Sequence, residues 1–138
     1  MKIRKISTGN NDEIRQVISL QEQWINSGLL PNTYNRIFRE WITEKSTIIA
    51  EKKGKIIGYS VFFQKADFFE IDSVYVIPDF RRQNIGHKLI QETESVIKSL
   101  GGKIIKICPM TTTNRDKLFQ YYQQLGYIPL GEIMQKEL

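Results

Sequence analysis

Cysteine is almost missing from this chain: Cys108 is the only one among 138 residues. A single thiol excludes an intrachain disulfide and argues against a metal site built on thiolates, so we expect no bound metal. No apolar run approaches the roughly 20 residues that a membrane-spanning helix needs. The first seven residues alternate charged and apolar side chains and lack the continuous apolar segment of a signal peptide. We therefore expect a soluble, cytoplasmic protein with no membrane partner.

Acidic residues are outnumbered, with 15 Asp and Glu against 20 Lys and Arg, which gives a net charge of +5. This excess suits an anionic partner, either a nucleic acid or a small phosphorylated cofactor. The basic residues are spread along the chain, whereas a nucleic-acid-binding protein usually has a denser stripe, so a nucleic-acid partner is the weaker choice. The length and the 41% hydrophobic content fit one globular domain over residues 1–138.

The spacing of apolar residues predicts alternating strands and helices without repeats or linkers. The first expected helix starts at Asn11 or Asp12 and runs to about residue 25, and further helices cover 33–44, 86–99 and 115–125. The expected strands cover 2–7, 47–51, 55–63, 68–76 and 103–108, and a final hairpin covers 127–138. A right-handed crossover through helix 86–99 makes strands 68–76 and 103–108 parallel neighbours. The order β-α-α-β-β-β-α-β-α-β-β predicts an α/β fold with a mixed sheet.

The segment between strand 68–76 and helix 86–99 carries the strongest functional signal. Such a turn points backbone N–H groups outward at the positive end of the helix dipole, which suits a phosphate. Gly86 lets a ligand approach the backbone, and Asn84 tolerates a left-handed conformation. Arg81 and Arg82 add positive charge. The alternative is an ordinary turn with solvated arginines, and the residues alone leave both interpretations open.

The same segment resembles a signature of the GNAT superfamily of N-acetyltransferases. That signature reads Arg/Gln-x-x-Gly-x-Gly/Ala before a helix, and this chain has Arg81-Arg82-Gln83-Asn84-Ile85-Gly86. The preceding Val74-Tyr75-Val76-Ile77-Pro78-Asp79-Phe80 resembles the family's approach to that loop. Asn84 replaces the first glycine of the signature. We interpret it as a tolerated variant because asparagine can adopt the same backbone shape.

A second resemblance lies further on, where Asn114 precedes a helix that ends in Tyr121-Tyr122-Gln123-Gln124-Leu125-Gly126-Tyr127. It is similar to the family's ending, in which a tyrosine can give a proton to the departing thiolate. Counting back from Gly126 selects Tyr122, whereas counting forward from Asn114 selects Tyr121, and we prefer Tyr122. The alternatives are a core aromatic for Tyr122 and a helix N-cap for Asn114.

The resemblance implies a GNAT-like fold whose central pair of parallel strands splays apart around acetyl-CoA. It implies acetyl transfer to an amine by direct attack in a ternary complex. The acceptor would be a small molecule or a peptide of unknown identity, and a homodimer is a further expectation. Pantetheine would pair with the strand backbone, and an N–H near Val76 would face the thioester oxygen. The implied cofactor-binding residues are Val74, Tyr75, Val76, Arg81, Arg82, Gln83, Asn84, Ile85, Gly86, His87, Asn114 and Tyr122.

The acceptor amine must lose a proton, since an alkylammonium has a pKa of about 10. Glu70 and Asp72 are the candidate bases, and Glu70 is favoured because it matches the glutamate of some family members. Their even spacing places them on one face with Val74 and Val76 unless a bulge intervenes. The alternative is a pair of surface acids on a half-exposed strand.

Other functions and roles stay open at this point. A binding module could keep the acyl-CoA groove without turnover and act as a sensor, and a small nucleic-acid-binding α/β domain is a third interpretation. Trp24, Tyr34 and Phe38 could shape acceptor choice. Cys108 could line the cofactor groove, although a buried inert thiol is the favoured interpretation.

Overall fold

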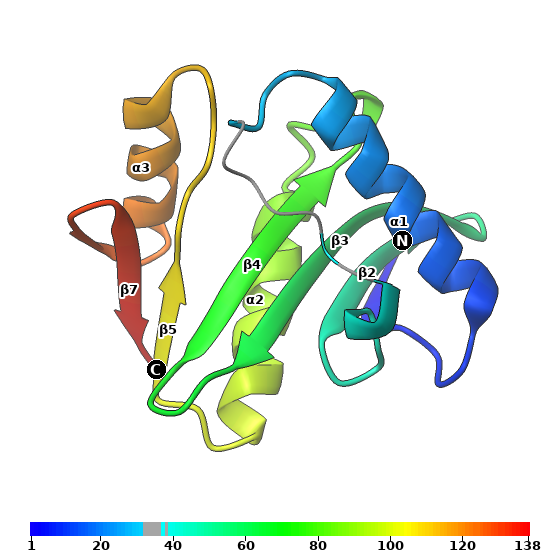
Figure 1. Ribbon diagram of the computed structural model, residues 1–138, viewed down its shortest axis with the longest axis horizontal. Coiled ribbons are helices and arrows are strands. Elements are labelled where there is room, and N and C mark those ends of the chain that lie inside the picture. The colour runs from blue at the N-terminus through cyan, green and yellow to red at the C-terminus, as the bar shows by residue number, and fades with distance from the viewer. Residues whose placement is uncertain (32–36, 38) are drawn as a thin grey trace.

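The computed structural model describes residues 1–31, 37 and 39–138 as a mixed seven-stranded sheet with helices on both faces (Figure 1). The strands are β1 (Lys2–Lys5), β2 (Thr47–Lys52), β3 (Lys55–Gln64), β4 (Phe69–Val76), β5 (Ile104–Ile107), β6 (Ile128–Leu130) and β7 (Ile133–Glu137). The helices are α1 (Asn11–Asn26), α2 (Ile85–Ser99) and α3 (Arg115–Gln124), with short 3-10 helices η1 (Arg39–Trp41) and η2 (Pro78–Phe80). The sheet order is β1-β2-β3-β4-β5-β7-β6, and β4 and β5 run parallel. The predicted mixed α/β fold is confirmed.

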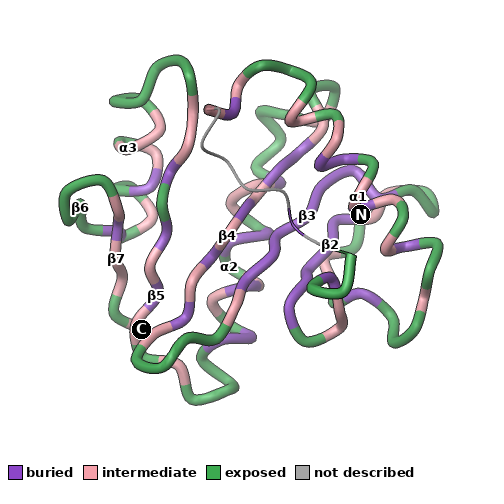
Figure 2. The backbone as a smooth tube through the Cα atoms, in the orientation of Figure 1, coloured by how far each residue is buried: buried purple, intermediate pink, exposed green. Residues whose placement is uncertain are grey.

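Two apolar cores lie on opposite faces of the sheet. On one face, α2 contributes Leu89 and Ile97 to a core that also contains Ile71 of β4. On the other face, α1 contributes Val17 and Leu20 to a second core with strands β2, β3 and β4. Figure 2 shows buried residues along most of the central strands between these layers. The end of β4 is therefore enclosed by helices on both faces.

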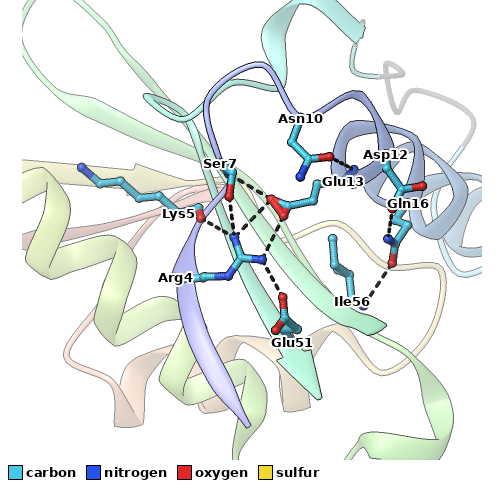
Figure 3. Close-up of polar contacts among 9 residues, drawn as sticks. All are labelled: Arg4, Lys5, Ser7, Asn10, Asp12, Glu13, Gln16, Glu51 and Ile56. Carbon is cyan, nitrogen blue, oxygen red and sulfur yellow. Dashed lines mark hydrogen bonds and ion pairs between the residues drawn. The ribbon is translucent and has the colours of Figure 1, made fainter. Parts of the chain in front are cut away.

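A cluster of charged and polar side chains fixes the start of α1 to the edge of the sheet (Figure 3). Asn10 caps the helix, because its Oδ1 accepts the Glu13 N–H at 3.1 Å. Arg4 of β1 donates to the two carboxylate oxygens of Glu13 at 3.1 and 2.9 Å and also to Glu51 of β2. The hydrogen bonds from Arg4 hold the pKa of Glu13 below its ordinary value. This buried charge is therefore ionised and paired at neutral pH, which orients α1 across the sheet.

The helix expected over 33–44 is wrong where the structure describes it, and residues 32–36 and 38 lie outside the described residues. From residue 39 to the start of β2 the chain forms only η1 and turns. The Ser46 hydroxyl accepts the Thr43 N–H at 3.1 Å and donates to the Trp41 carbonyl at 2.5 Å. Such local bonds compete with helical ones, so helix-like apolar spacing did not produce a helix here. The other predicted elements are present, with ends within about two residues of those expected.

The parallel ladder between β4 and β5 is short. It contains the pairs Phe69 with Ile105, Glu70 with Lys106, and Ile71 with Ile107. Beyond Ile71, β4 continues to Val76 along β3, while the chain after β5 diverges from it (Figure 1). The predicted splay of the two parallel strands is therefore present.

A β-bulge in β4 changes which residues share a face. Val61 pairs with Ser73, and the next residue of β3, Phe62, pairs with Ile71, so Asp72 is an extra residue on β4. Such a bulge shifts the alternation of side chains by one residue. Ser73 consequently lies opposite Val61, on the face that α1 covers.

The expectation that Glu70, Asp72, Val74 and Val76 share one face is therefore wrong, because it required an uninterrupted strand. Val74 and Val76 pack in the core on the α2 side. Glu70 lies opposite Phe63, which packs in the core on the α1 side. The two acids thus lie on the α1 face, across the sheet from the two valines.

Candidate active site

The loop before α2 leaves a run of backbone N–H groups available. Asn84 has φ 66° and adopts the predicted left-handed conformation, and Arg82 also has a positive φ of 64°. None of the described residues accepts a hydrogen bond from the N–H groups of 82–87. The first turn of a helix always leaves such donors, and its dipole adds partial positive charge. The loop can therefore bind an anion of phosphate size.

Two contacts hold this loop in place. The Arg81 Nε donates to the Val76 carbonyl at 2.9 Å, and the guanidinium lies 5.5 Å from the centre of the Tyr75 ring. Arg81 thus braces the loop against β4. On the other side, a Cβ at Gly86 would lie 3.4 Å from the Tyr121 hydroxyl and 4.0 Å from Val76 Cγ2. Glycine keeps this meeting point of β4, α2 and α3 open.

A cleft of about 170 Å³ lies where β4 and the chain that follows β5 splay apart. Its walls come from the end of α1, from β4, from the segment after β5 and from α3. The lining residues are Trp24, Leu29, Leu30, Asp72, Ser73, Val74, Ile107, Cys108, Pro109, Met110, Thr111, Leu118 and Tyr122. The segment after β5 is tied to the turn after α1, because Thr112 donates from its N–H to the Leu29 carbonyl at 2.9 Å and from Oγ1 to the Gly28 carbonyl at 2.8 Å. These bonds fix the width of the cleft at that end.

Val74 and Val76 present backbone groups toward the cleft side of β4. The Ile77 N–H donates to the Ile57 carbonyl of β3 at 3.0 Å. Successive N–H groups of a strand point to alternate edges, so those of Val76 and Val74 point away from β3. On that edge β4 has no ladder partner beyond Ile71. A free edge of this kind can pair with an extended ligand that carries amides.

Asp72 and Ser73 place buried polar atoms without partners at the cleft. Asp72 Oδ2 and Ser73 Oγ are both buried, and neither makes a hydrogen bond within the described part of the chain. Burial raises the pKa of Asp72 to about 6, and the Glu70 carboxylate adds to the rise. A carboxylate with this pKa is mostly ionised at neutral pH and can accept a proton.

A groove of about 570 Å³ shares the lining residue Asp72 with the cleft. Its lining residues are Ile37, Glu40, Trp41, Thr43, Phe63, Gln64, Lys65, Glu70 and Asp72. Trp41 and Phe63 pack edge to face in its wall, with ring centres 5.7 Å apart. Asp72 lines both hollows, whereas Glu70 lines only the groove. The carboxylate of Asp72 therefore stands where two separate ligands could meet.

The two neighbouring tyrosines of α3 lie in different places. Tyr122 is buried and lines the cleft, and burial raises its pKa well above the ordinary value, so it stays protonated. The Tyr121 hydroxyl instead approaches the start of α2 at Gly86. Asn114 occupies the N-cap position of α3 with φ 51°, but its side chain makes no capping bond. Its amide is therefore not used to cap the helix.

Other predicted cofactor-binding residues do not line the cleft. Ile85 is the buried first residue of α2, His87 is half-buried, and Gln83 is exposed in the loop. The Tyr75 ring is buried and stacks on Trp24, with 5.2 Å between ring centres, so the ring faces α1. Tyr34 and Phe38, predicted to shape acceptor choice, lie outside the described residues.

Two positions differ from the sequence interpretation. The favoured interpretation of Cys108 as a buried thiol is wrong, because Cys108 is exposed at the end of β5 and lines the cleft. Ser73 was not predicted as a site residue. The signal for it is a change of apolar spacing from two to three between Ile71 and Val74, which marks the bulge.

The described residues contain neither a candidate membrane span nor a candidate metal site. No helix among residues 1–31 and 39–138 is long and apolar enough to cross a membrane. In the same part of the chain, no group of three or more His, Cys, Asp or Glu side chains is arranged to hold a metal ion.

Comparison with solved structures gives matches over the whole chain. A ribosomal-protein-alanine N-acetyltransferase from Brucella melitensis is 17% identical, with a TM-score of 0.79 and coverage of 100% of both chains. The PaiA N-acetyltransferase from Thermoplasma acidophilum in complex with coenzyme A is 21% identical, with a TM-score of 0.71 over 99% of this chain and 98% of that chain. An aminoglycoside 6'-N-acetyltransferase from Enterococcus faecium is 17% identical, with a TM-score of 0.76 over 99% and 97% of the two chains.

Comparison with curated proteins gives no match. The model of the acetyltransferase (GNAT) family, however, matches residues 14–127, which include the loop before α2, the cleft and both tyrosines of α3. This match confirms the family and the acetyl-CoA-dependent N-acetyltransferase activity that the two sequence motifs predicted. The chain therefore belongs to the acetyltransferase (GNAT) family.

Proposed function

We propose that the acetyl group of acetyl-CoA lies in the cleft and that the acceptor amine enters through the groove, so that the two meet at Asp72. The observation that carries this proposal is the position of Asp72, which lines both hollows with a buried Oδ2 that lacks a partner. An unpaired buried carboxylate oxygen is costly in a folded protein unless a ligand uses it.

The coenzyme is held along β4. Its diphosphate lies against the free N–H groups of 82–87, and its pantetheine amides pair with the free backbone edge of Val74 and Val76. Because Val76 leads directly toward Gly86, one extended molecule can reach both places. The Val76 N–H then stabilises the oxyanion that forms on the thioester carbonyl.

The reaction is a direct transfer in a ternary complex. The ionised Asp72 takes one proton from the acceptor ammonium, and the amine nitrogen attacks the thioester carbon to form a C–N bond and an oxyanion. The oxyanion collapses, the C–S bond breaks, and Tyr122 gives its proton to the departing thiolate. The nitrogen loses its second proton to the tyrosinate, which completes the balance. We favour Asp72 over Glu70 as the base because Glu70 does not line the cleft.

The groove suits a protonated amine. Glu40, Glu70 and Asp72 supply negative charge there, and Trp41 and Phe63 supply aromatic surface that attracts cations. Lys65 is the one basic residue among the described lining residues of the groove. Both a small amine and a peptide amine fit this description, so the acceptor can be of either kind.

Calorimetry with acetyl-CoA and an amine panel with a thiol-release assay test the proposal together. We expect acetyl-CoA to bind and Asp72→Asn to lower kcat by about 100-fold or more, the usual effect of losing a general base. Glu70→Gln is the matched control and should change kcat by less than about tenfold. Binding without thiol release from any amine would instead support the non-catalytic sensor, and absence of acetyl-CoA binding would contradict the whole proposal.

Three further expectations stay predictions: one domain over residues 1–138, a cytoplasmic location and a homodimer. The homodimer has one supporting feature, since Ile128 and Leu130 of the edge strand β6 are 64% and 50% exposed. Sedimentation of the purified chain tests it directly.

A further inference from the structure

We infer that Ser73 and Asp72 together form a two-oxygen seat for the nitrogen of the acceptor, and that this seat selects primary amines. The inference rests on the proposed function, because it assigns Ser73 a role in the same site. No sequence motif pointed to Ser73, which the bulge in β4 brings to the site.

The bulge turns two consecutive residues toward the same side of the sheet. In a regular strand, neighbours such as Asp72 and Ser73 face opposite sides. Here Asp72 is the extra residue, Ser73 lies opposite Val61 on the α1 face, and Asp72 joins Glu70 and Phe63 in the groove on that face. Their side chains are close enough for the Ser73 hydroxyl to oppose the rise in the pKa of Asp72. They nevertheless make no hydrogen bond of normal length and angle with each other.

The Ser73 side chain is buried, and its hydroxyl makes no hydrogen bond of normal geometry inside the described protein. The residue is only 3% exposed, it lines the cleft, and its Oγ has no hydrogen-bond partner. Folded proteins pair almost all such groups, and a ligand is one way to satisfy an exception. Asp72 Oδ2 has the same status at the same place. Two unpaired oxygens side by side are suited to a donor that bonds to both.

Ser60 shows what a structural serine looks like in this fold. It is fully buried on β3, and its hydroxyl accepts a hydrogen bond from Thr93 of α2 at 2.9 Å. It lines neither the cleft nor the groove. Ser60 is therefore a matched control, because it is the same residue type, equally buried, on the neighbouring strand.

A primary ammonium meets the needs of both oxygens. One N–H points at Asp72, and its proton is the one that is transferred. A second N–H donates to Ser73 Oγ, and its hydrogen stays on the nitrogen. After transfer, this second bond holds the neutral amine so that its lone pair points at the thioester carbon. A secondary amine has one N–H fewer, so it cannot keep the bond to Ser73 and also have a proton to lose after attack. Ser73 is thus an acceptor-binding residue that sets amine class.

The test uses Ser73→Ala, Ser73→Thr and Ser60→Ala in the full chain. Benzylamine, spermidine, lysine and an alanine-terminated tetrapeptide are the probes, each beside its N-methyl derivative. For the best primary probe, Ser73→Ala should raise the acceptor KM about tenfold or more and reduce the preference over the N-methyl derivative. The Kd for acetyl-CoA should stay within about twofold, and Ser73→Thr should restore part of the loss.

Thermal unfolding of the free variants gives a second readout that needs no acceptor. Ser73→Ala should melt at or above the wild-type temperature because it removes an unpaired buried hydroxyl, whereas Ser60→Ala should melt lower because it removes the buried hydrogen bond between Thr93 and Ser60. An unchanged KM and amine preference in Ser73→Ala, or a fall in its melting temperature as large as that of Ser60→Ala, would overturn the seat. Failure of the wild type to acetylate any probe would count against the proposed function instead.

Discussion

Asp72 is the residue whose environment differs most from that of an exposed side chain of its type. Burial raises its pKa to about 6 from the ordinary 3.8, with a smaller contribution from Glu70. A carboxyl with a raised folded-state pKa stabilises the fold when protonated. Its favourable contribution is complete below pH 3.8 and is lost as the pH rises through 6. The ionised form that the proposed base needs is therefore also the form in which the folded protein is less stable.

Asp72→Asn removes the ionisable carboxyl and, with it, the loss of stability that ionisation causes. A shift of about two units corresponds to at most about 3 kcal/mol, and screening of the half-buried group reduces this to about 1–2 kcal/mol. We expect the variant to unfold at a higher temperature than the wild type above pH 6, with the difference shrinking to nothing below about pH 4. Thermal melts between pH 3.5 and 8 measure this. A difference that is the same at every pH would show that ionisation of Asp72 is not the cause.

Tyr122→Phe separates chemistry from packing. The ring packs among Tyr121 and Tyr127 at 5.2 and 5.8 Å between centres, and phenylalanine keeps that packing. We expect kcat to fall by about 100-fold through loss of the acid, with the Kd for acetyl-CoA and the melting temperature nearly unchanged. Tyr121→Phe is the control, and an equal loss of kcat in that variant would assign the acid to Tyr121.

At this scale the sequence predicts backbone shape better than side-chain direction. The left-handed conformation of Asn84 follows from its residue type and its place before a helix. The direction of Asp72 does not, because the spacing of three between Ile71 and Val74 marks an extra residue but does not say which way its side chain points. The exposure of Cys108 depends on where the segment after β5 turns, which no local pattern indicates.

At the scale of elements, the start of α2 is the feature on which the proposed binding of the coenzyme depends. The helix has no acidic residue in its first turn and no side-chain cap, so its N–H groups and dipole face outward unshielded. Most natural helices would place a capping oxygen there. The missing cap is consistent with a ligand that supplies the negative charge.

Gln83→Glu tests this electrostatic role. Gln83 is exposed beside the free N–H groups, and a carboxylate there repels a diphosphate. We expect the Kd for acetyl-CoA to rise about tenfold at low salt, and less at high salt because exposed charges are screened. Gln91→Glu, on an exposed position further along α2, should leave the Kd within about twofold. Equal effects of the two variants would show that only net charge matters.

The elements themselves were largely predictable because apolar periodicity and glycine breaks are local signals. The exception is the stretch before β2, where the helical spacing of apolar residues ends at Ile42 and is followed by the hydroxyls of Thr43 and Ser46, which form local hydrogen bonds. The sequence therefore contains two conflicting signals there. The contacts between side chains and backbone decided between them.

At the scale of the whole molecule, the cleft is lined by segments from both the N-terminal and the C-terminal part of the chain. α1 and the turn after it contribute one wall, and β5 and α3 contribute another, linked through Thr112. Cys108 lies in this wall and is the single thiol of the protein. The chain around the exposed Cys108 still partly desolvates its thiol, which raises the pKa, so its reaction with thiol reagents is slow at neutral pH and speeds up as the pH rises.

Acetyl-CoA should protect Cys108 from labelling. We expect saturating coenzyme to slow the reaction of Cys108 with a maleimide at least fivefold at pH 8, because a ligand in the cleft covers its wall. The same concentration should raise the melting temperature of the protein. Adenosine diphosphate is the control, since it lacks the pantetheine arm and should protect less. Full labelling in the presence of a coenzyme that demonstrably binds would place pantetheine elsewhere.

The ladder between β4 and β5 stops after three pairs, and the remainder of β4 keeps an empty place for one more strand. A reactant that fills this place becomes, for the length of one turnover, a piece of the protein's own secondary structure. Release of the product coenzyme then resembles the fraying of a strand from the end of a sheet, in which the hydrogen bonds between amides break one after another. The turnover rate is in that case governed by the same hydrogen bonds that hold strands together. Amide hydrogen exchange at Val74 and Val76 would then follow the rate of coenzyme release.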